Sequence, residues 1–438
     1  MSRQHLLLLL LITLMITSCS DTNKTTSDQV EDLKPRCIEH WPEDPQAKPT
    51  PPLNIDNAGQ VLWTKEVPGG TNTGPLAMAG DRLAYLSSTT LVILDTEGNF
   101  VNSFQESTAF TGHGPPVADE EGNFYFGAAE VISVTSDGQP RWHFALGGDI
   151  LGSETTYTSL LTLSPDGILY FSATDGFLYA VRATDGTQLW RQKVGLTKYG
   201  GHSPYGAYLG IGDVLIAEKG YHDRKTGTLI ASHPVIDGEP MPVNLASFTH
   251  LFGYRVIDKD NLLFYRPAMD KCGDQKWSFP SGKSLYANLV GFNDTILTNY
   301  GDEAFIYSSD GEPLVGPAPL DLHYFPKAIG ADGTLYYNYC TELYQKDRGV
   351  ASVQAYSPQL ELLWSVELGK SCTDEPFVLA DDGRLYVLRS TFEEFPDHLE
   401  LKGLELTAIQ TASPGLANTA YPTLRTNNRR TGWIGGPQ

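Results

Sequence analysis

A unit of about 40 residues that recurs along the chain is the feature that most limits how this sequence can fold. Its clearest copy, residues 159–194, contains four short runs rich in aromatic and β-branched side chains. Asp-Gly steps separate these runs at Asp166-Gly167, Asp175-Gly176 and Asp185-Gly186. Because glycine supplies the positive φ that tight hairpin turns require, the unit is predicted to be an antiparallel sheet of four strands.

A glycine followed four positions later by tryptophan marks the last run of the unit. Five tryptophans occupy this slot: Trp63, Trp142, Trp190, Trp277 and Trp364, the last with Leu360 in place of the glycine. In the same register, three further copies hold Asn102, Ala231 and Val315. The eight slots lie 38 to 49 residues apart, which is close to the length that four strands and their turns require.

Eight such sheets cannot each bury their faces alone, but sheets stacked around an axis bury both faces and protect their edges. The sequence therefore predicts an all-β, eight-bladed β-propeller built of four-stranded antiparallel blades. The last copy provides only three convincing strands, and residues 59–66 (GQVLWTKE) are predicted to complete that blade and close the ring. A linear β-solenoid or a pair of sandwiches would not account for the recurrent glycine and tryptophan.

Residues 178–190 (LYAVRATDGTQLW) resemble the LYALDAxTGKxxW docking repeat of pyrroloquinoline-quinone (PQQ) propellers, and residues 223–227 (DRKTG) match the centre of that repeat. The resemblance implies that each indole packs between adjacent blades, where a large flat side chain fits, and no catalytic role is assigned to the tryptophans. The copies depart from the pattern, since Arg182 replaces the usual aspartate and only five slots hold tryptophan. This dilution is similar to the non-enzymatic branch of the family, which includes the lipoprotein propeller of the outer-membrane barrel-assembly machinery.

The N-terminus has the pattern of an export signal. An apolar run over residues 6–16 is followed by Cys19, in an arrangement that resembles the bacterial lipobox. Residues 1–18 are therefore predicted to be a lipoprotein signal peptide and Cys19 the lipidated residue; the alternative is an ordinary signal peptide with an incidental cysteine. Ser20 then implies, by family resemblance, the outer membrane, on either its periplasmic or its surface face. Residues 19–58, which are Pro-rich from 44 to 53, are predicted to be a flexible tether.

The propeller is predicted to occupy residues 59–433, with a C-terminal tail from about residue 411. Four cysteines besides Cys19 are available for up to two disulfides, in any of three pairings: Cys37, Cys272, Cys340 and Cys372. The formal net charge of −21 disfavours binding to nucleic acid and to anionic lipid headgroups. The chain is predicted to be monomeric.

Four histidines stand near the start of a repeat, where a propeller borders its central channel: His113, His202, His250 and His323. They could converge on a metal or an anionic ligand, but no carboxylate stands at a fixed offset from them, and solvated loop histidines are the alternative. The quinone dehydrogenases of the resembling family hold Ca²⁺ with Glu, Asn and Asp, and many carry adjacent cysteines, which this chain lacks. We therefore expect no metal, no PQQ, no calcium and no catalytic residue.

These observations favour a non-catalytic scaffold, anchored to the outer membrane, that binds a protein partner or an envelope polymer, with outer-membrane protein assembly as the specific hypothesis. The alternatives are a PQQ-dependent periplasmic dehydrogenase and a small-ligand carrier or sensor that uses the central channel. Residues 391–402 (TFEEFPDHLELK) form an acidic insertion, predicted to be a solvated loop or part of a recognition face. The tail residues 421–433 are predicted to pack across a propeller face with Trp433 as the anchor.

Overall fold

The structure is a computed structural model. It describes residues 41, 43, 45–70, 73–105, 114–127, 129–146, 158, 160–173, 175–194, 209–217, 220–232, 235–236, 239–240, 243–246, 251–253, 267–270, 272, 274–278, 285–300, 303–319, 326–340, 350–370, 377–394, 399–420, 422–423 and 426–434. All of these lie in one compact unit, Pro35–Gln438. In this part of the chain, no helix is both long and apolar enough to cross a membrane.

Within the described residues, eight antiparallel sheets each contain a set of four strands, and seven of these sets are consecutive in the chain. The first sheet contains β2 (Ala77–Ala79), β3 (Arg82–Ser87), β4 (Thr90–Asp95) and β5 (Phe100–Gln105). The second contains β6 (Val117–Ala118), β7 (Phe124–Gly127), β8 (Glu130–Val134) and β9 (Pro140–Ala145). The third contains β10 (Thr162–Leu163), β11 (Ile168–Ser172), β12 (Phe177–Arg182) and β13 (Gln188–Lys193). The fourth contains β14 (Leu209–Ile211), β15 (Val214–Ala217), β16 (Gly220–Asp223) and β17 (Leu229–Ser232).

The remaining sheets follow the same order. The fifth contains β20 (Val243–Ala246), β21 (Leu251–Gly253), β22 (Pro267–Met269) and β23 (Gln275–Ser278). The sixth contains β24 (Leu285–Val290), β25 (Ile296–Tyr300), β26 (Glu303–Tyr307) and β27 (Pro313–Pro319), with a short 3-10 turn, η1 (Phe292–Asp294), between its first two strands. The seventh contains β28 (Pro326–Ile329), β29 (Leu335–Cys340), β30 (Val350–Tyr356) and β31 (Leu362–Lys370). A separate hairpin, β18 (Val235–Ile236) and β19 (Glu239–Pro240), lies between the fourth and fifth sheets in the sequence.

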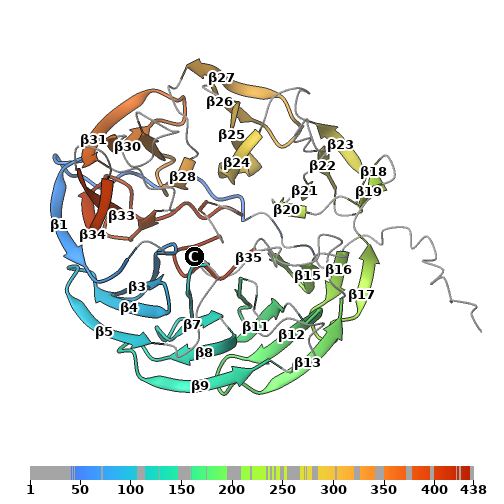
Figure 1. Cartoon of the computed structure of the whole chain (residues 1–438). Coiled ribbons are helices and arrows are strands. Elements are labelled where there is room, and N and C mark those ends of the chain that lie inside the picture. Colours follow the sequence, from blue (N-terminus) through green and yellow to red (C-terminus); the bar gives the residue numbers. More distant parts are fainter. Residues whose placement is uncertain are drawn as a thin grey trace, which may run out of the picture. The chain divides into compact units, whose positions relative to one another are not determined.

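The eighth sheet combines strands from both ends of the described chain. It contains β32 (Val378–Leu379), β33 (Arg384–Glu394) and β34 (Leu399–Gln410), and its fourth strand is β1 (Val61–Val67). β1 runs antiparallel to β34, with Lys65 opposite Leu406. Figure 1 shows the sheets arranged around a common centre, with the fourth strands β5, β9, β13 and β17 on the outside. The predicted all-β propeller class is confirmed.

The hydrophobic core is divided among the seams between neighbouring sheets. The alternation of side chains along a strand gives every inner strand two apolar faces, and each face packs on a different neighbour. Residues that share a buried cluster across a seam are, in chain order, Leu91 with Phe126, Val131 with Phe171, Leu178 with Leu215, Ile216 with Ala268 and Ile296, Leu297 with Tyr337, Ala355 with Leu385, and Leu388 with Leu83. The last of these clusters joins the eighth sheet to the first.

Two predictions of irregular structure need correction. Within the predicted tether, the backbone N–H of Thr50 donates to Ala331 O and that of Leu53 to Ala412 O, both at 2.7 Å. Residues 50–53 therefore belong to the propeller surface, because this extended segment meets carbonyl groups that the turns leave open. Most of the predicted acidic loop is also ordered, since Thr391 pairs with Gly403 and Glu394 with Leu399 as β33 and β34 continue beyond the other strands of their sheet.

Candidate functional site

The recurrent tryptophan and glycine of the repeat meet in the seams between sheets. There, the indole ring of one sheet covers a glycine of the next. The Trp142 indole N–H donates to Ala183 O at 2.9 Å, and a Cβ added to Gly186 would lie 2.8 Å from the ring. Trp190 repeats this geometry with Arg224 O at 3.1 Å and with Gly227. The tryptophans thus fill seams between sheets, where their role is packing.

The same contact recurs at every described slot that holds tryptophan. The pairs are Trp63 with Gly98, Trp142 with Gly186, Trp190 with Gly227, Trp277 with Gly311, and Trp364 with Gly59. The glycine and the tryptophan of one Gly-x-x-x-Trp motif therefore serve two different seams, a division of roles that the sequence analysis missed. In the last pair, Trp364 of the seventh sheet covers Gly59. This glycine lies two residues before β1, which belongs to the eighth sheet.

Two of the degenerate slots show how the seam adapts. Asn102 occupies a tryptophan slot, and its side-chain amide donates to Asp137 O at 2.8 Å, beside Gly138. Val315 occupies another, in the sheet that precedes the one copy where Leu360 replaces the glycine. Leu360 is buried in the same apolar cluster on which Val315 packs. A smaller side chain thus faces a larger one, and the volume of the seam is preserved.

The centre of the sheets is occupied by the C-terminal tail, residues 411–434. Backbone N–H groups of five first strands donate to tail carbonyls: Met78 to Asn428, Ala118 to Arg429, Leu163 to Thr431, Gly210 to Gly432, and Ile329 to Pro422, over 2.8–3.0 Å. Near its end the tail forms β35 (Trp433–Ile434), which runs parallel to β14. The predicted path across one face is therefore wrong: the tail instead follows the inner edges of the sheets, because those edge strands offer unpaired backbone donors.

Arg430 is the largest fully buried side chain of the tail. It is 0% exposed, and its guanidinium donates to Leu76 O at 2.9 Å, to Phe377 O at 2.8 Å and to Thr423 Oγ1 at 2.9 Å. Leu76 directly precedes the first sheet, Phe377 directly precedes the eighth sheet, and Thr423 belongs to the tail itself. The five-donor fork of arginine suits such a junction, since one side chain satisfies carbonyls from separate segments.

Trp433 anchors the end of the tail, as predicted. The side chain is 4% exposed, and its ring stacks on Tyr170 of the third sheet with the ring centroids 6.0 Å apart. The same ring covers Gly210 of the fourth sheet so closely that no side chain would fit there. The tail thus uses an indole and a glycine as the repeat does, but at the inner edge of the sheets.

Beside Trp433, two adjoining hollows of about 310 Å³ each open over the turns between first and second strands of the second, third and fourth sheets. Within the lining of these hollows, Arg224 contacts Asp166 at 2.6 Å and Asp213 at 2.9 Å. Burial opposes ionisation of Asp166, but the hydrogen bonds from Arg224 and Ser164 prevail and lower the pKa of its carboxyl. Burial raises the pKa of Tyr170, which packs beneath, to about 12. Hydrogen bonds and ion pairs therefore hold the floor of the hollows, and the acidic side chains of their lining outnumber the basic ones.

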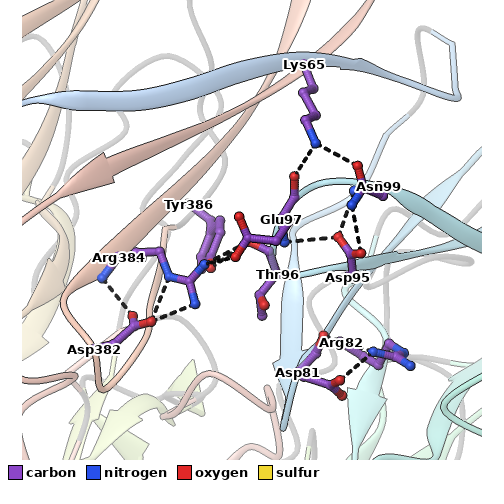
Figure 2. Close-up of polar contacts among 10 residues, drawn as sticks. All are labelled: Lys65, Asp81, Arg82, Asp95, Thr96, Glu97, Asn99, Asp382, Arg384 and Tyr386. Atoms are coloured by element: carbon purple, nitrogen blue, oxygen red, sulfur yellow. Dashed lines mark hydrogen bonds and ion pairs between the residues drawn. The ribbon is translucent and has the colours of Figure 1, made fainter.

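A polar network holds the eighth sheet to the first (Figure 2). Arg384 of β33 contacts Glu97 at 2.6 Å and Asp382 at 2.6 Å, and the Tyr386 hydroxyl donates to Thr96 O at 3.0 Å. Lys65 of β1 donates to Glu97 O at 2.6 Å. Side chains of β33 and β1, two strands of the eighth sheet, thus both bond to the turn between β4 and β5.

Most of the residues predicted for lipidation, ligand binding or disulfide bonds lie outside the described part of the chain. These are Cys19, Cys37, Cys372, His113, His202, His250 and His323. Cys340 ends β29, and Cys272 is disulfide-bonded, but the cysteine that pairs with it is not among the described side chains. Over the residues that are described, no group of three or more His, Cys, Asp or Glu side chains could hold a metal ion.

Comparison with known proteins identifies the repeat. Residues 53–267 match a family model described as outer membrane protein assembly factor BamB, which confirms the PQQ-like propeller resemblance for that region. No curated protein matches the sequence. Among solved structures, BamB from Moraxella catarrhalis is 11% identical, with a TM-score of 0.49 over 80% of this chain and 100% of its own. The computationally designed Ika8 protein is 12% identical, with a TM-score of 0.49 over 83% and 100%.

A europium-containing methanol dehydrogenase is also similar, at 11% identity and a TM-score of 0.47 over 80% of this chain and 93% of its own. These solved structures thus include both an assembly factor and an enzyme. Similarities of this size do not decide between the two activities.

Proposed function

From the match of residues 53–267 to the assembly-factor model, we propose that this chain is a non-catalytic propeller scaffold that binds a protein partner in the outer-membrane envelope and takes part in outer-membrane protein assembly. The observation that carries the proposal is the filled centre. Arg430, Asn427 and Thr426 are buried there, and the tail bonds to the inner strands of most sheets. A propeller with an occupied axis keeps its loops and outer walls for binding, which suits a scaffold.

The enzyme alternative and the channel-ligand alternative both need space and polar ligands that converge near the axis. The described residues do not fit PQQ with calcium, since the inner strands are hydrogen-bonded to the tail and the guanidinium group of Arg430 is buried among them. A cationic centre opposes Ca²⁺, which takes oxygen ligands of negative charge. This supports a scaffold that works without PQQ, calcium or another metal.

The proposal includes a lipid anchor at Cys19 that attaches the propeller to the outer membrane, on its periplasmic or its surface face. Acylation at this residue would hold the chain on the membrane without a spanning helix. Cys19→Ala should move the protein from the membrane fraction to the soluble fraction, as read by fractionation and blotting. Retention of the variant in the membrane fraction would exclude the anchor.

The partner is tested by crosslinking in intact envelopes and affinity recovery of the full chain. The affinity tag is best inserted between Thr25 and Thr26, because the C-terminal residues are built into the centre of the propeller. We expect components of the barrel-assembly machinery among the crosslinked proteins, and their loss when the Cys19→Ala variant is used. Recovery of no such component from the wild-type chain would refute the assembly role.

A further inference from the structure

A cavity of about 410 Å³ lies in the seam between the eighth and first sheets, and we call it the seam cavity. Its walls come from three segments: the β1–β2 connection, the β3–β4 hairpin with β4, and β5. The lining residues are Pro68, Gly69, Gly70, Ser87, Ser88, Thr90, Val92, Phe100 and Ser103. A volume of this size falls in the range of about 300–1,000 Å³ that small-ligand sites occupy.

The lining carries no charged side chain, although the chain has 31 basic and 52 acidic residues. Four of the lining residues carry hydroxyl groups, namely Ser87, Ser88, Thr90 and Ser103. Each hydroxyl can donate one hydrogen bond and accept others. The cavity can therefore bind a neutral ligand with many hydroxyl groups, whereas a phosphate or carboxylate would find no cation there and would meet the acidic field of the chain.

Phe100 adds an aromatic surface to this uncharged lining. Its side chain is 54% exposed on the outer strand of the first sheet. An exposed ring beside hydroxyl groups provides an apolar face and polar edges in one site. The C–H face of a sugar ring packs on the former, and the sugar hydroxyls bond to the latter.

The polar wall of the seam cavity is held in place before any ligand binds. The Gly70 N–H donates to Ser87 Oγ at 2.9 Å, and the Thr73 hydroxyl donates to Gly70 O at 2.8 Å. The Tyr85 hydroxyl donates to Pro68 O at 2.5 Å. Binding therefore does not have to order residues 68–70, which lowers its entropic cost.

We propose that the seam cavity binds a neutral pyranose unit of a glycan, with Phe100 under the sugar ring and the hydroxyl groups of Ser103 and Thr90 at its edge. A fatty acyl chain fits less well, because it would cover the hydroxyl groups of Ser103 and Thr90 without bonding to them. The proposal is independent of the assembly role, since it concerns a different surface and a different ligand. A single uncharged sugar in a shallow site is expected to bind with a Kd of about 1 mM.

The test uses the full chain in detergent, with N,N′-diacetylchitobiose and maltose as separate probes, followed by ligand-observed NMR and calorimetry. We expect at least one sugar to bind, Phe100→Ala to weaken it at least tenfold, and Phe100→Tyr to retain it. Ser103→Ala should weaken binding several-fold. Leu189→Ala removes a similarly exposed apolar side chain (40%) from the outer strand of the third sheet and should leave binding unchanged.

The two probes distinguish an N-acetylated glycan from a glucose polymer, and binding of either supports the site. Each variant must keep the thermal transition of the wild-type chain, so that lost binding is not lost folding. Failure of both sugars to bind at 20-fold above the expected Kd, or equal binding by Phe100→Ala, would overturn the proposal. The scaffold proposal would stand in that case, because the crosslinking experiment does not depend on this cavity.

Discussion

Replacing Arg430 tests whether the tail holds the propeller together from its centre. Hydrogen bonds from a charged donor contribute about 1.5–3 kcal/mol each, so three of them amount to about 4–9 kcal/mol. Removing the charge also removes the cost of keeping it from water, which is several kcal/mol. We therefore expect Arg430→Met to lower the free energy of unfolding by about 3 kcal/mol, since two buried carbonyls lose their donor.

The expected change in thermal unfolding, followed by circular dichroism, is a fall in Tm of about 6 °C, at about 2 °C per kcal/mol for a large domain. Arg182→Met is the matched control, because the Arg182 side chain is half-exposed and forms a surface ion pair with Asp185 at 3.0 Å. Such a pair contributes less than about 1 kcal/mol. Arg430→Gly separates side chain from backbone, since residue 430 has a φ of +58° that glycine adopts without strain. A Tm of Arg430→Met no lower than that of Arg182→Met would refute the reasoning.

Three further predictions concern the seams and the turn-bearing face. Gly186→Ala should destabilise more than Gly167→Ala: both have positive φ, but only the first would press a Cβ into an indole, at a further cost of about 1–3 kcal/mol in chemical denaturation. Val315→Trp should destabilise alone and recover when combined with Leu360→Gly, with a coupling energy above about 0.5 kcal/mol; simple additivity would contradict the exchange of volumes. Asp166→Asn should reduce the loss of unfolding free energy that occurs as the pH is lowered below about 4. Because folding lowers the pKa of that carboxyl, its contribution is present above the unfolded value of about 4 and is lost as the pH falls through the folded value.

The strands and turns of the repeat were predictable because their chemistry is local. Asp175-Gly176 forms the predicted turn, with Gly176 at a φ of +82° and the Phe177 N–H bonded to the Asp175 carboxylate. That tryptophans fill the seams was also predictable, since a large flat indole at a fixed position of every repeat suits packing between sheets. That each indole covers the glycine of the following copy was not, although the paired change of Val315 and Leu360 was a usable signal.

The candidate sites were less accessible to sequence reasoning. The four histidines drew attention as a metal-ligand pattern, but they lie outside the described residues. No pattern in the sequence pointed to the seam cavity. Serine, threonine and glycine are common in loops, and whether they come together depends on which strands become neighbours. The tail was recognised as a docking segment with Trp433 as its anchor, yet Arg430 in the same stretch appeared only as one basic residue among several.

By itself, the sequence determined the repeat length, the four-stranded sheets, the hairpin turns and the residue types that fill the seams, because each depends on contacts within a few dozen residues. Only the tertiary structure decided the path of the C-terminal tail along the inner strands of the sheets. The Arg430 side chain reaches the carbonyls of Leu76 and Phe377, which lie 354 and 53 residues away along the chain. Such pairings depend on the summed rotation of all intervening sheets, which no local pattern of residues encodes.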